Sequence, residues 1–88
     1  MIRREALICN RLGLHARAAA KLVQLANQFQ SQVFLSTDRM SANAKSILGV
    51  LTLAAGKDTP VVLEVDGPDE EQAMAQITAL IAGRFGEE

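Results

Sequence analysis

The alternation of apolar and polar residues along this 88-residue chain predicts four strands and three helices. Residues 2–9 show the two-residue period of a strand, with Ala6 and Ile8 on one face. Residues 16–27 show a helical period instead. The apolar stripe of this helix is formed by Ala19, Leu22, Val23 and Ala26, and its polar face by Arg17, Lys21, Gln24 and Gln28.

The middle of the chain predicts two short strands and a short helix. Residues 33–35 are apolar and predict a strand, a turn is expected at residues 37–38, and a third strand is expected over residues 39–42. Ser46 has the position of an N-cap for a helix over residues 47–53. Gly56 is expected to end that region.

The last third predicts one strand and one long helix. Pro60 precedes residues 61–65, which are the clearest strand in the chain. Asp69 is expected to cap the final helix, with Gln72 completing a capping box. The buried stripe of this helix is expected to consist of Met74, Ile77, Leu80 and Ile81.

The resulting order is βαββαβα, which predicts an α+β fold. We expect an open-faced sandwich, in which a four-stranded antiparallel sheet carries three helices on one face. The two apolar helix stripes would pack onto that face. At this length, residues 1–88 are expected to form a single domain.

The amino-acid composition argues against several classes of function. One cysteine, Cys9, excludes an internal disulfide, and one histidine and one cysteine make a metal site a poor expectation. The chain has no Trp or Tyr and three Phe, so it lacks the stacking surfaces of a nucleic-acid-binding domain. No apolar run reaches membrane-spanning length and residues 1–12 lack a secretory signal, so we expect a cytoplasmic protein without membrane insertion.

Charge is divided unevenly between the two halves of the chain. Residues 1–45 hold seven Lys or Arg and two Asp or Glu, whereas residues 46–88 hold two and eight. A surface built from the first half would favour an acidic partner or a phosphate group. Ordinary solvated charges are the alternative interpretation.

His15 is the only histidine, and it lies directly before the first predicted helix. It could serve only as an N-cap. Alternatively, its neutral imidazole is a nucleophile near pH 7, the free N–H groups of the first helical turn can bind phosphoryl oxygens, and Arg17 offers a guanidinium to the same oxygens. This combination predicts covalent phosphoryl transfer to nitrogen. A hydrolase is less favoured, because no Ser or Asp is placed beside His15 by the sequence.

Two motifs resemble a known family. The segment Asn-Arg-Leu-Gly-Leu-His-Ala-Arg at residues 10–17, continuing as Ala-Ala-Ala-Lys-Leu-Val, is similar to the active-site signature of the HPr family. These proteins are the histidine phosphocarriers of the bacterial phosphoenolpyruvate-dependent phosphotransferase system. The segment Asn-Ala-Lys-Ser-Ile-Leu-Gly-Val-Leu at residues 43–51 is similar to the second family signature, and the βαββαβα order is that of the family.

The resemblance implies a carrier role and its chemistry. His15 would accept phosphate at Nδ1 from Enzyme I and pass it to a histidine of an EIIA protein. Arg17 and the backbone N–H groups of Ala16, Arg17 and Ala18 would stabilise the phosphoryl group. The protein would be a monomeric phosphoryl-transfer intermediate that needs no cofactor, rather than a turnover enzyme. Ala18 departs from the family, which usually has Pro at this position, so the pose of Arg17 is open.

The resemblance also implies docking and regulatory residues. Ser46 matches a site that HPr kinase/phosphorylase modifies in some relatives, although a plain helix cap is an equal interpretation. Three apolar residues of the short helix are either core or an exposed patch for Enzyme I and EIIA. The docking set implied by the family is Ala20, Lys21, Gln24, Lys45, Ile47, Leu48 and Leu51.

The branch of the family is not decided by the sequence. The tail over residues 79–88 resembles the nitrogen-branch paralogue NPr, whereas the Lys-Ser-Ile motif at residues 45–47 is closer to relatives under kinase control. The alternative function is therefore a regulatory binding module that signals through its phosphorylation state.

Overall fold

The computed structural model describes residues 1–87, and the last residue of the NPr-like tail, Glu88, lies outside the described residues. The order of elements confirms the predicted βαββαβα arrangement, with one short turn added at the C-terminal end. The elements are β1 (Ile2–Ile8), α1 (Ala16–Ala26), β2 (Gln32–Ser36), β3 (Ser41–Asn43), α2 (Ile47–Leu53), β4 (Thr59–Asp66), α3 (Glu70–Ala82) and η1 (Arg84–Gly86).

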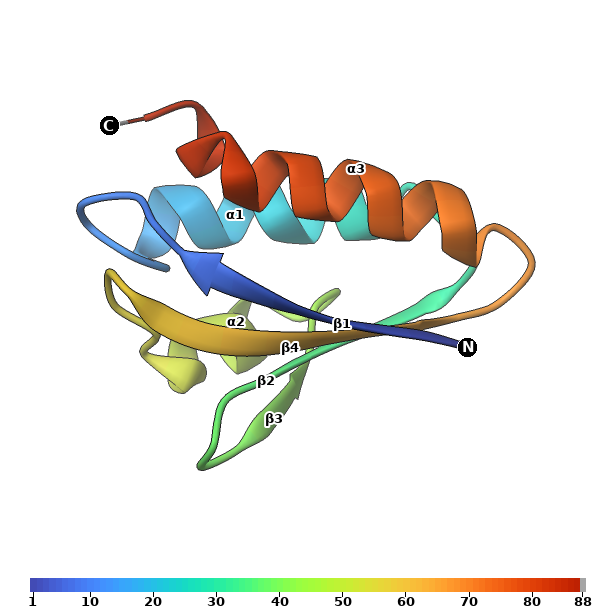
Figure 1. Ribbon diagram of the computed structural model, residues 1–88, viewed down its shortest axis with the longest axis horizontal. Coiled ribbons are helices and arrows are strands. Elements are labelled where there is room, and N and C mark those ends of the chain that lie inside the picture. The colour runs from blue at the N-terminus through green and yellow to red at the C-terminus, as the bar shows by residue number, and fades with distance from the viewer. Residues whose placement is uncertain (88) are drawn as a thin grey trace.

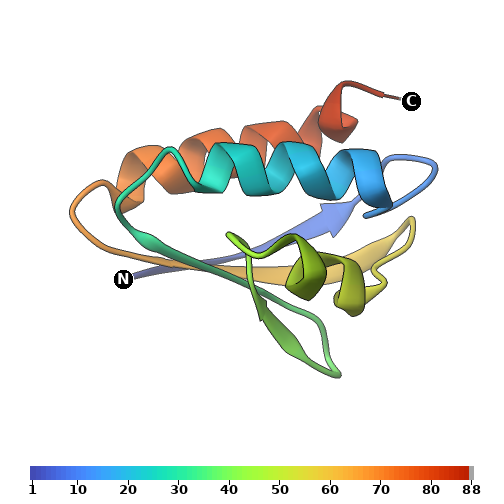
Figure 2. The ribbon, with the colours of Figure 1, turned by 180° about the vertical axis from the view of Figure 1, so that it is seen from behind.

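The four strands form one antiparallel sheet in the order β1-β4-β2-β3. Strand β4 is therefore central, and its register pairs Ile2 with Val65 on one side and Val33 with Val65 on the other. Helices α1 and α3 lie side by side over one face of the sheet, as Figures 1 and 2 show from opposite sides. Helix α2 packs against α1 and β3. The predicted fold class is confirmed.

The core lies between the sheet and the helix pair. The inward residues of β4 are Val61, Leu63 and Val65, all buried. Each such side chain contributes about 1.5–3 kcal/mol when it is fully removed from water. The helices contribute Ala18, Ala19, Leu22 and Ala26 from α1, and Ala73, Met74, Ile77 and Ile81 from α3. Two members of the predicted stripes, Val23 and Leu80, are only partly buried.

In the middle of the chain the third strand was predicted to begin too early, whereas the helix predicted over residues 47–53 is confirmed. Strand β3 begins at Ser41 rather than residue 39, because a turn closed by Thr37 N donating to Met40 O (2.8 Å) uses the residues between them. Helix α2 ends at Leu53, as predicted, and its C-cap is Ala54. Ala54 adopts the left-handed conformation (φ 52°) and its N–H donates to Leu51 O, so the helix needs no glycine to stop.

The predicted capping box at α3 was also wrong. Asp69 occupies the N-cap position, but its carboxylate makes no cap hydrogen bond to its own helix. It accepts hydrogen bonds from the N–H groups of Gln30 and Ser31 (both 2.9 Å) and from the Ser31 hydroxyl. These bonds, the Ser31 hydroxyl foremost, lower the pKa of Asp69. The carboxylate thus joins the start of α3 to the connection between α1 and β2.

Candidate functional site

The site begins with a turn that only glycine fits. Gly13 has a φ of 68°, and a Cβ placed there would lie 2.6 Å from Ala55 O and 2.7 Å from Gly56 Cα. The next residue, Leu14, donates its N–H to Ala55 O at 2.8 Å and is buried. The start of α1 is therefore held against the loop that follows α2, and this fixes the backbone that carries His15.

His15 is the N-cap of α1, as predicted. Its backbone is extended, its carbonyl accepts from Ala19 N at 2.8 Å, and its Nδ1 accepts from Arg17 N at 3.4 Å. The contact at 3.4 Å is long for a hydrogen bond, so the Nδ1 lone pair is only weakly engaged. The imidazole remains accessible, with about a quarter (27%) of its side-chain surface exposed.

After α3, the C-terminal segment over residues 84–87 folds back over the beginning of α1 (Figures 1 and 2). Arg84, Phe85 and Gly86 all have positive φ, at 58°, 56° and 74°. The Phe85 ring is completely buried, and Lys21 Nζ donates to Phe85 O at 2.6 Å. Left-handed backbone costs about 1–3 kcal/mol for a residue other than glycine, so this anchoring has to offset real strain.

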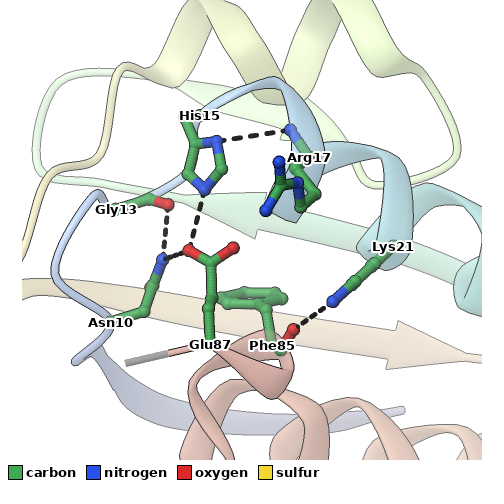
Figure 3. Close-up of polar contacts among 7 residues, drawn as sticks. All are labelled: Asn10, Gly13, His15, Arg17, Lys21, Phe85 and Glu87. Carbon is green, nitrogen blue, oxygen red and sulfur yellow. Dashed lines mark hydrogen bonds and ion pairs between the residues drawn. The ribbon is translucent and has the colours of Figure 1, made fainter.

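The segment brings the Glu87 carboxylate to the ring of His15, as Figure 3 shows. His15 Nε2 lies 2.8 Å from Glu87 Oε1, and Asn10 Nδ2 donates to the same oxygen at 2.9 Å. Asn10 is fully buried and also donates to Gly13 O at 2.7 Å. The pKa of Glu87 is lowered, first by the bond from His15 and then by the bond from Asn10. The lowered pKa favours the ionised carboxylate, which only accepts hydrogen bonds.

These neighbours determine which ring nitrogen carries the proton. A backbone N–H such as that of Arg17 can only donate, and an ionised carboxylate such as that of Glu87 can only accept. Since Arg17 N faces Nδ1 and Glu87 faces Nε2, the neutral imidazole of His15 is protonated at Nε2. Its Nδ1 keeps an unshared electron pair, which is the requirement for a nucleophile.

A shallow hollow lies next to the Glu87 carboxylate that contacts the ring. It has a volume of about 210 Å³ and is lined by Arg11, Leu12, Arg17 and Glu87. The side chains of both arginines are exposed, and the charge of Arg17 contributes to the lowered pKa of Glu87. Arg11 and Arg17 thus line this hollow together with the carboxylate that contacts His15, and guanidinium groups are well suited to bind phosphoryl oxygens.

The first turn of α1 supplies backbone donors at the same place. Ala16, Arg17 and Ala18 precede Ala19, whose N–H makes the intrahelical bond to His15 O. The N–H groups of a first turn have no partner inside the helix and carry partial positive charge. Ala18 retains an N–H that proline would lack, while its methyl group is fully buried.

Helix α2 presents an apolar surface beside α1. Ile47, Leu48 and Leu51 are exposed at 39%, 74% and 36%, whereas Val50 and Leu53 are buried. Of the two interpretations of these three side chains, the structure supports an exposed patch over core. Ser46 caps this helix as predicted, since its Oγ accepts from Gly49 N at 3.2 Å.

The remaining residues of the implied docking set differ in exposure and in hydrogen bonding. Gln24 is exposed and Ala20 is partly buried. The two lysines are tied to backbone carbonyls, because Lys21 Nζ donates to Phe85 O and Lys45 Nζ donates to Phe29 O at 2.8 Å. The structure thus gives both lysines a role in holding distant segments of the chain together.

Sequence reasoning assigned no role to Asn10, Phe85 or Glu87. Asn10 lies within the quoted motif, but its partner Glu87 is 77 residues away, and no local pattern connects two positions so far apart. The signal available in the sequence was a single large apolar residue, Phe85, in the otherwise small and polar segment 82–88. That residue is the anchor of the segment that completes the site.

Two further properties hold for residues 1–87. Nowhere in this range do three or more His, Cys, Asp or Glu side chains come together as a metal site would require. None of the helices in the same range has the length and apolar character needed to cross a membrane.

Comparison with known proteins finds similar sequences over nearly the whole chain. Residues 2–83 match the family described as the PTS HPr component phosphorylation site. The chain is 58% identical over 87 residues to the phosphocarrier protein HPr of Cupriavidus necator, covering 99% of this chain and 98% of that protein. It is 40% identical to the phosphocarrier protein NPr of Shewanella violacea, covering 98% and 94%.

One solved structure is similar to this chain in both sequence and fold. The crystal structure of HPr-C-His from Thermoanaerobacter tengcongensis has a TM-score of 0.96 and 42% identity, and the match covers 100% of this chain and 99% of that one. Sequence match, fold and the arrangement around the single histidine lead to one conclusion. The chain belongs to the HPr family of phosphocarrier proteins.

Proposed function

We propose that this protein carries a phosphoryl group on Nδ1 of His15, receiving it from Enzyme I and giving it to a histidine of an EIIA protein. The observation that carries the proposal is the arrangement of the ring. Nε2 faces the Glu87 carboxylate and Nδ1 faces only a long contact from Arg17 N, so Nδ1 is the free nucleophile. The side chain of Arg17 and the first turn of α1 lie beside the ring (Figure 3).

The surroundings of Nδ1 suit a phosphoryl group held for a limited time. A phosphoryl group on Nδ1 would carry about two negative charges near neutral pH, close to the guanidinium of Arg17 and the N–H groups of Ala16, Arg17 and Ala18. These donors are fixed before the group arrives, so little reorganisation is needed. No cofactor takes part, and the protein acts as a stoichiometric intermediate rather than a turnover enzyme.

Residues 1–88 act as one domain and one copy suffices in this proposal. Asn10, His15, Arg17 and Glu87 all come from the same chain, so the site needs no second copy to complete it. The carrier would work as a monomer in the cytoplasm, where phosphoenolpyruvate is the ultimate phosphoryl donor.

Enzyme I and EIIA would dock on the surface formed by α1 and α2 beside the ring. An exposed apolar centre surrounded by charge is suited to a transient complex. The centre consists of Ile47, Leu48 and Leu51, and its neighbours in the proposed interface are Ala20, Lys21, Gln24 and Lys45.

The test is phosphorylation by Enzyme I with labelled phosphoenolpyruvate. We expect wild-type protein to acquire an acid-labile, alkali-stable label, as expected for a phosphohistidine. His15→Ala should lose the label completely, and Ser46→Ala should retain it. A wild-type protein that stays unlabelled, or a His15→Ala variant that is labelled normally, would overturn the carrier proposal.

Regulation through Ser46 is the second candidate function. Its side chain is exposed at the N-terminus of α2, directly beside the exposed Leu48. A phosphate on Ser46 Oγ would be electrostatically favoured there and would add charge to the edge of an apolar docking surface. In Ser46→Asp we therefore expect weaker phosphorylation of His15 by Enzyme I. Labelling of Ser46 by a HPr kinase/phosphorylase with ATP, absent in Ser46→Ala, would establish the regulation, and failure of both experiments would exclude it.

A further inference from the structure

We infer that Asn10 and Glu87 form a positioning pair that keeps the proton of His15 on Nε2 throughout the phosphoryl-transfer cycle. The inference rests on the proposed function, because it concerns the same ring. Figure 3 shows the arrangement, in which the carboxylate lies between the buried amide of Asn10 and the imidazole. One carboxylate oxygen, Glu87 Oε1, receives both the 2.9 Å bond from Asn10 and the 2.8 Å contact from His15 Nε2.

The geometry is maintained at an energetic cost. The second oxygen, Glu87 Oε2, is buried and receives no hydrogen bond from any residue in the range 1–87, and the same holds for Asn10 Oδ1. Buried polar atoms without partners are uncommon in folded proteins and each calls for an explanation. Together with the left-handed backbone of Arg84 and Phe85, they indicate that this segment is built to hold one carboxylate in one place.

The pair is connected to the turn that carries the histidine. Asn10 Nδ2 also donates to Gly13 O, and Gly13 N donates to Asn10 O at 3.1 Å. A shift of the Asn10 side chain would therefore disturb both the carboxylate and the backbone two residues before His15. Carboxylates that fix a functional histidine in one tautomer act in this way in metal sites, where their loss costs about 10- to 100-fold.

The transfer steps show why the position of the proton matters. In the forward step the Nδ1 electron pair forms a bond to phosphorus, the donor's bond to phosphorus breaks, and its electron pair stays with the donor. His15 then bears a phosphoryl group on Nδ1 and a proton on Nε2, and the positive charge of the ring lies against the Glu87 carboxylate. When the group moves to the next acceptor, the electron pair returns to Nδ1 and the ring is again the neutral Nε2–H form. No proton has to move in either direction.

The first test measures the tautomer without any partner protein. The ¹⁵N chemical shifts of the His15 ring, recorded at alkaline pH, report the proportion of Nε2–H and Nδ1–H forms. We expect wild type to be almost entirely Nε2–H, and Glu87→Ala to show a several-fold higher Nδ1–H proportion. Glu71→Gln is the matched control, since it removes an exposed carboxylate at the opposite end of α3. Phe85 stays in place in Glu87→Ala, so the fold should be retained.

The second test measures the initial rate of phosphorylation by Enzyme I. Glu87→Ala should lose on the order of tenfold. Glu87→Gln separates the two roles of the carboxylate, because it keeps an oxygen that accepts from Nε2–H but removes the charge. Its tautomer should resemble wild type, with a rate between those of wild type and Glu87→Ala. The double variant Asn10→Ala/Glu87→Ala should have nearly the same tautomer proportion as Glu87→Ala, because Asn10 reaches the ring nitrogen only through Glu87, while its lost bond to Gly13 O affects the rate rather than the tautomer.

The outcomes separate this inference from the carrier proposal. If Glu87→Ala has the wild-type tautomer proportion, or if its tautomer changes while its rate does not, the positioning role is wrong even though His15 is phosphorylated. If wild-type protein is not phosphorylated at all, the carrier proposal fails, while the tautomer experiment still decides whether Asn10 and Glu87 position the ring.

Discussion

The N-termini of α1 and α2 are both capped by a polar side chain, but the surfaces around the two caps differ. Each helix begins with a polar side chain at the N-cap, His15 in α1 and Ser46 in α2. The Ser46 hydroxyl makes an ordinary cap, accepting from Gly49 N at 3.2 Å. His15 makes a poorer one, with its Nδ1 3.4 Å from Arg17 N, and its ring is held from the other side by Glu87.

The difference shows that the stronger cap belongs to the helix that does not carry the histidine. At α2 the cap stabilises a seven-residue helix whose outer face is apolar and exposed. At α1 the capping contact is weak, so Nδ1 stays available, and Glu87 of the C-terminal segment holds the ring through Nε2. A strong cap engages the lone pair of the capping atom in a hydrogen bond, whereas a nucleophile needs that lone pair to be unshared.

The largest expected effect comes from removing the anchor of the C-terminal segment. Phe85 is fully buried, so Phe85→Ala should cost about 3 kcal/mol or more in the free energy of unfolding, measured by urea denaturation. The segment should then detach from His15, which raises the Nδ1–H proportion, while the amide shifts around Ser46 stay unchanged. Phe34→Ala, at a ring exposed by 37%, should cost much less. Equal costs in the two variants would contradict the anchoring role of Phe85.

The next effect separates docking from chemistry at α2. Leu48 is 74% exposed, so Leu48→Asp should leave the free energy of unfolding nearly unchanged. It should raise the KM for Enzyme I phosphorylation about tenfold, about 1.4 kcal/mol, because a charge enters an apolar contact, while kcat is retained. Met40→Asp is the control, since Met40 is similarly apolar and 41% exposed but lies in the turn before β3. An unchanged KM in Leu48→Asp would remove α2 from the docking surface.

The two termini also differ in how much of them could be predicted. Both N-caps follow from residues within a few positions of each helix, so local spacing located His15 and Ser46 correctly. The exposure of Leu48 could not be decided locally, because three neighbouring apolar residues fit either core or surface. The closure of the α1 site by Glu87 depends on Phe85 filling a place in the core, and only the packed structure determines that. Asp69 illustrates the same limit, since its hydrogen-bond partners lie 38 and 39 residues away and override its role as a cap.

A smaller effect compares the two caps directly in stability. Ser46→Ala should lower the free energy of unfolding by about 1 kcal/mol, because Gly49 N loses its acceptor. Ser46→Thr, which keeps a hydroxyl, should recover most of that loss. His15→Ala would remove both the 3.4 Å cap contact and the 2.8 Å contact with Glu87, so the cap is tested in a Glu87→Ala background, where only the cap contact remains. In that background His15→Ala should cost less than Ser46→Ala. A larger stability loss there than in Ser46→Ala would mean that the α1 terminus is a structural cap after all.

The smallest expected effect is a titration confined to the α1 terminus. The pKa of Glu87 is lowered in the folded protein, chiefly by the bond from His15 and next by the bond from Asn10, with the charges of His15 and Arg17 adding to it. A lowered folded-state pKa means that the stability from these contacts is fully present above the unfolded value of about 4.3, and is lost as the pH falls through the lowered value. The carboxyl ¹³C shift of Glu87 should therefore titrate below that of an unstructured glutamate.

Asn10→Ala provides the comparison within one molecule. Removing the amide that donates to Glu87 Oε1 should move the Glu87 midpoint upward, towards the ordinary value. The Asp69 midpoint, which is lowered chiefly by the Ser31 hydroxyl and then by Gln30 N–H, should not move, because none of its partners is shared. If both midpoints rise, Asn10→Ala has loosened the whole fold. If neither rises, the amide of Asn10 does not hold the carboxylate. The ring of His15 is then fixed only because Phe85 anchors the C-terminal segment, and the difference from the simple cap at α2 rests on that anchor.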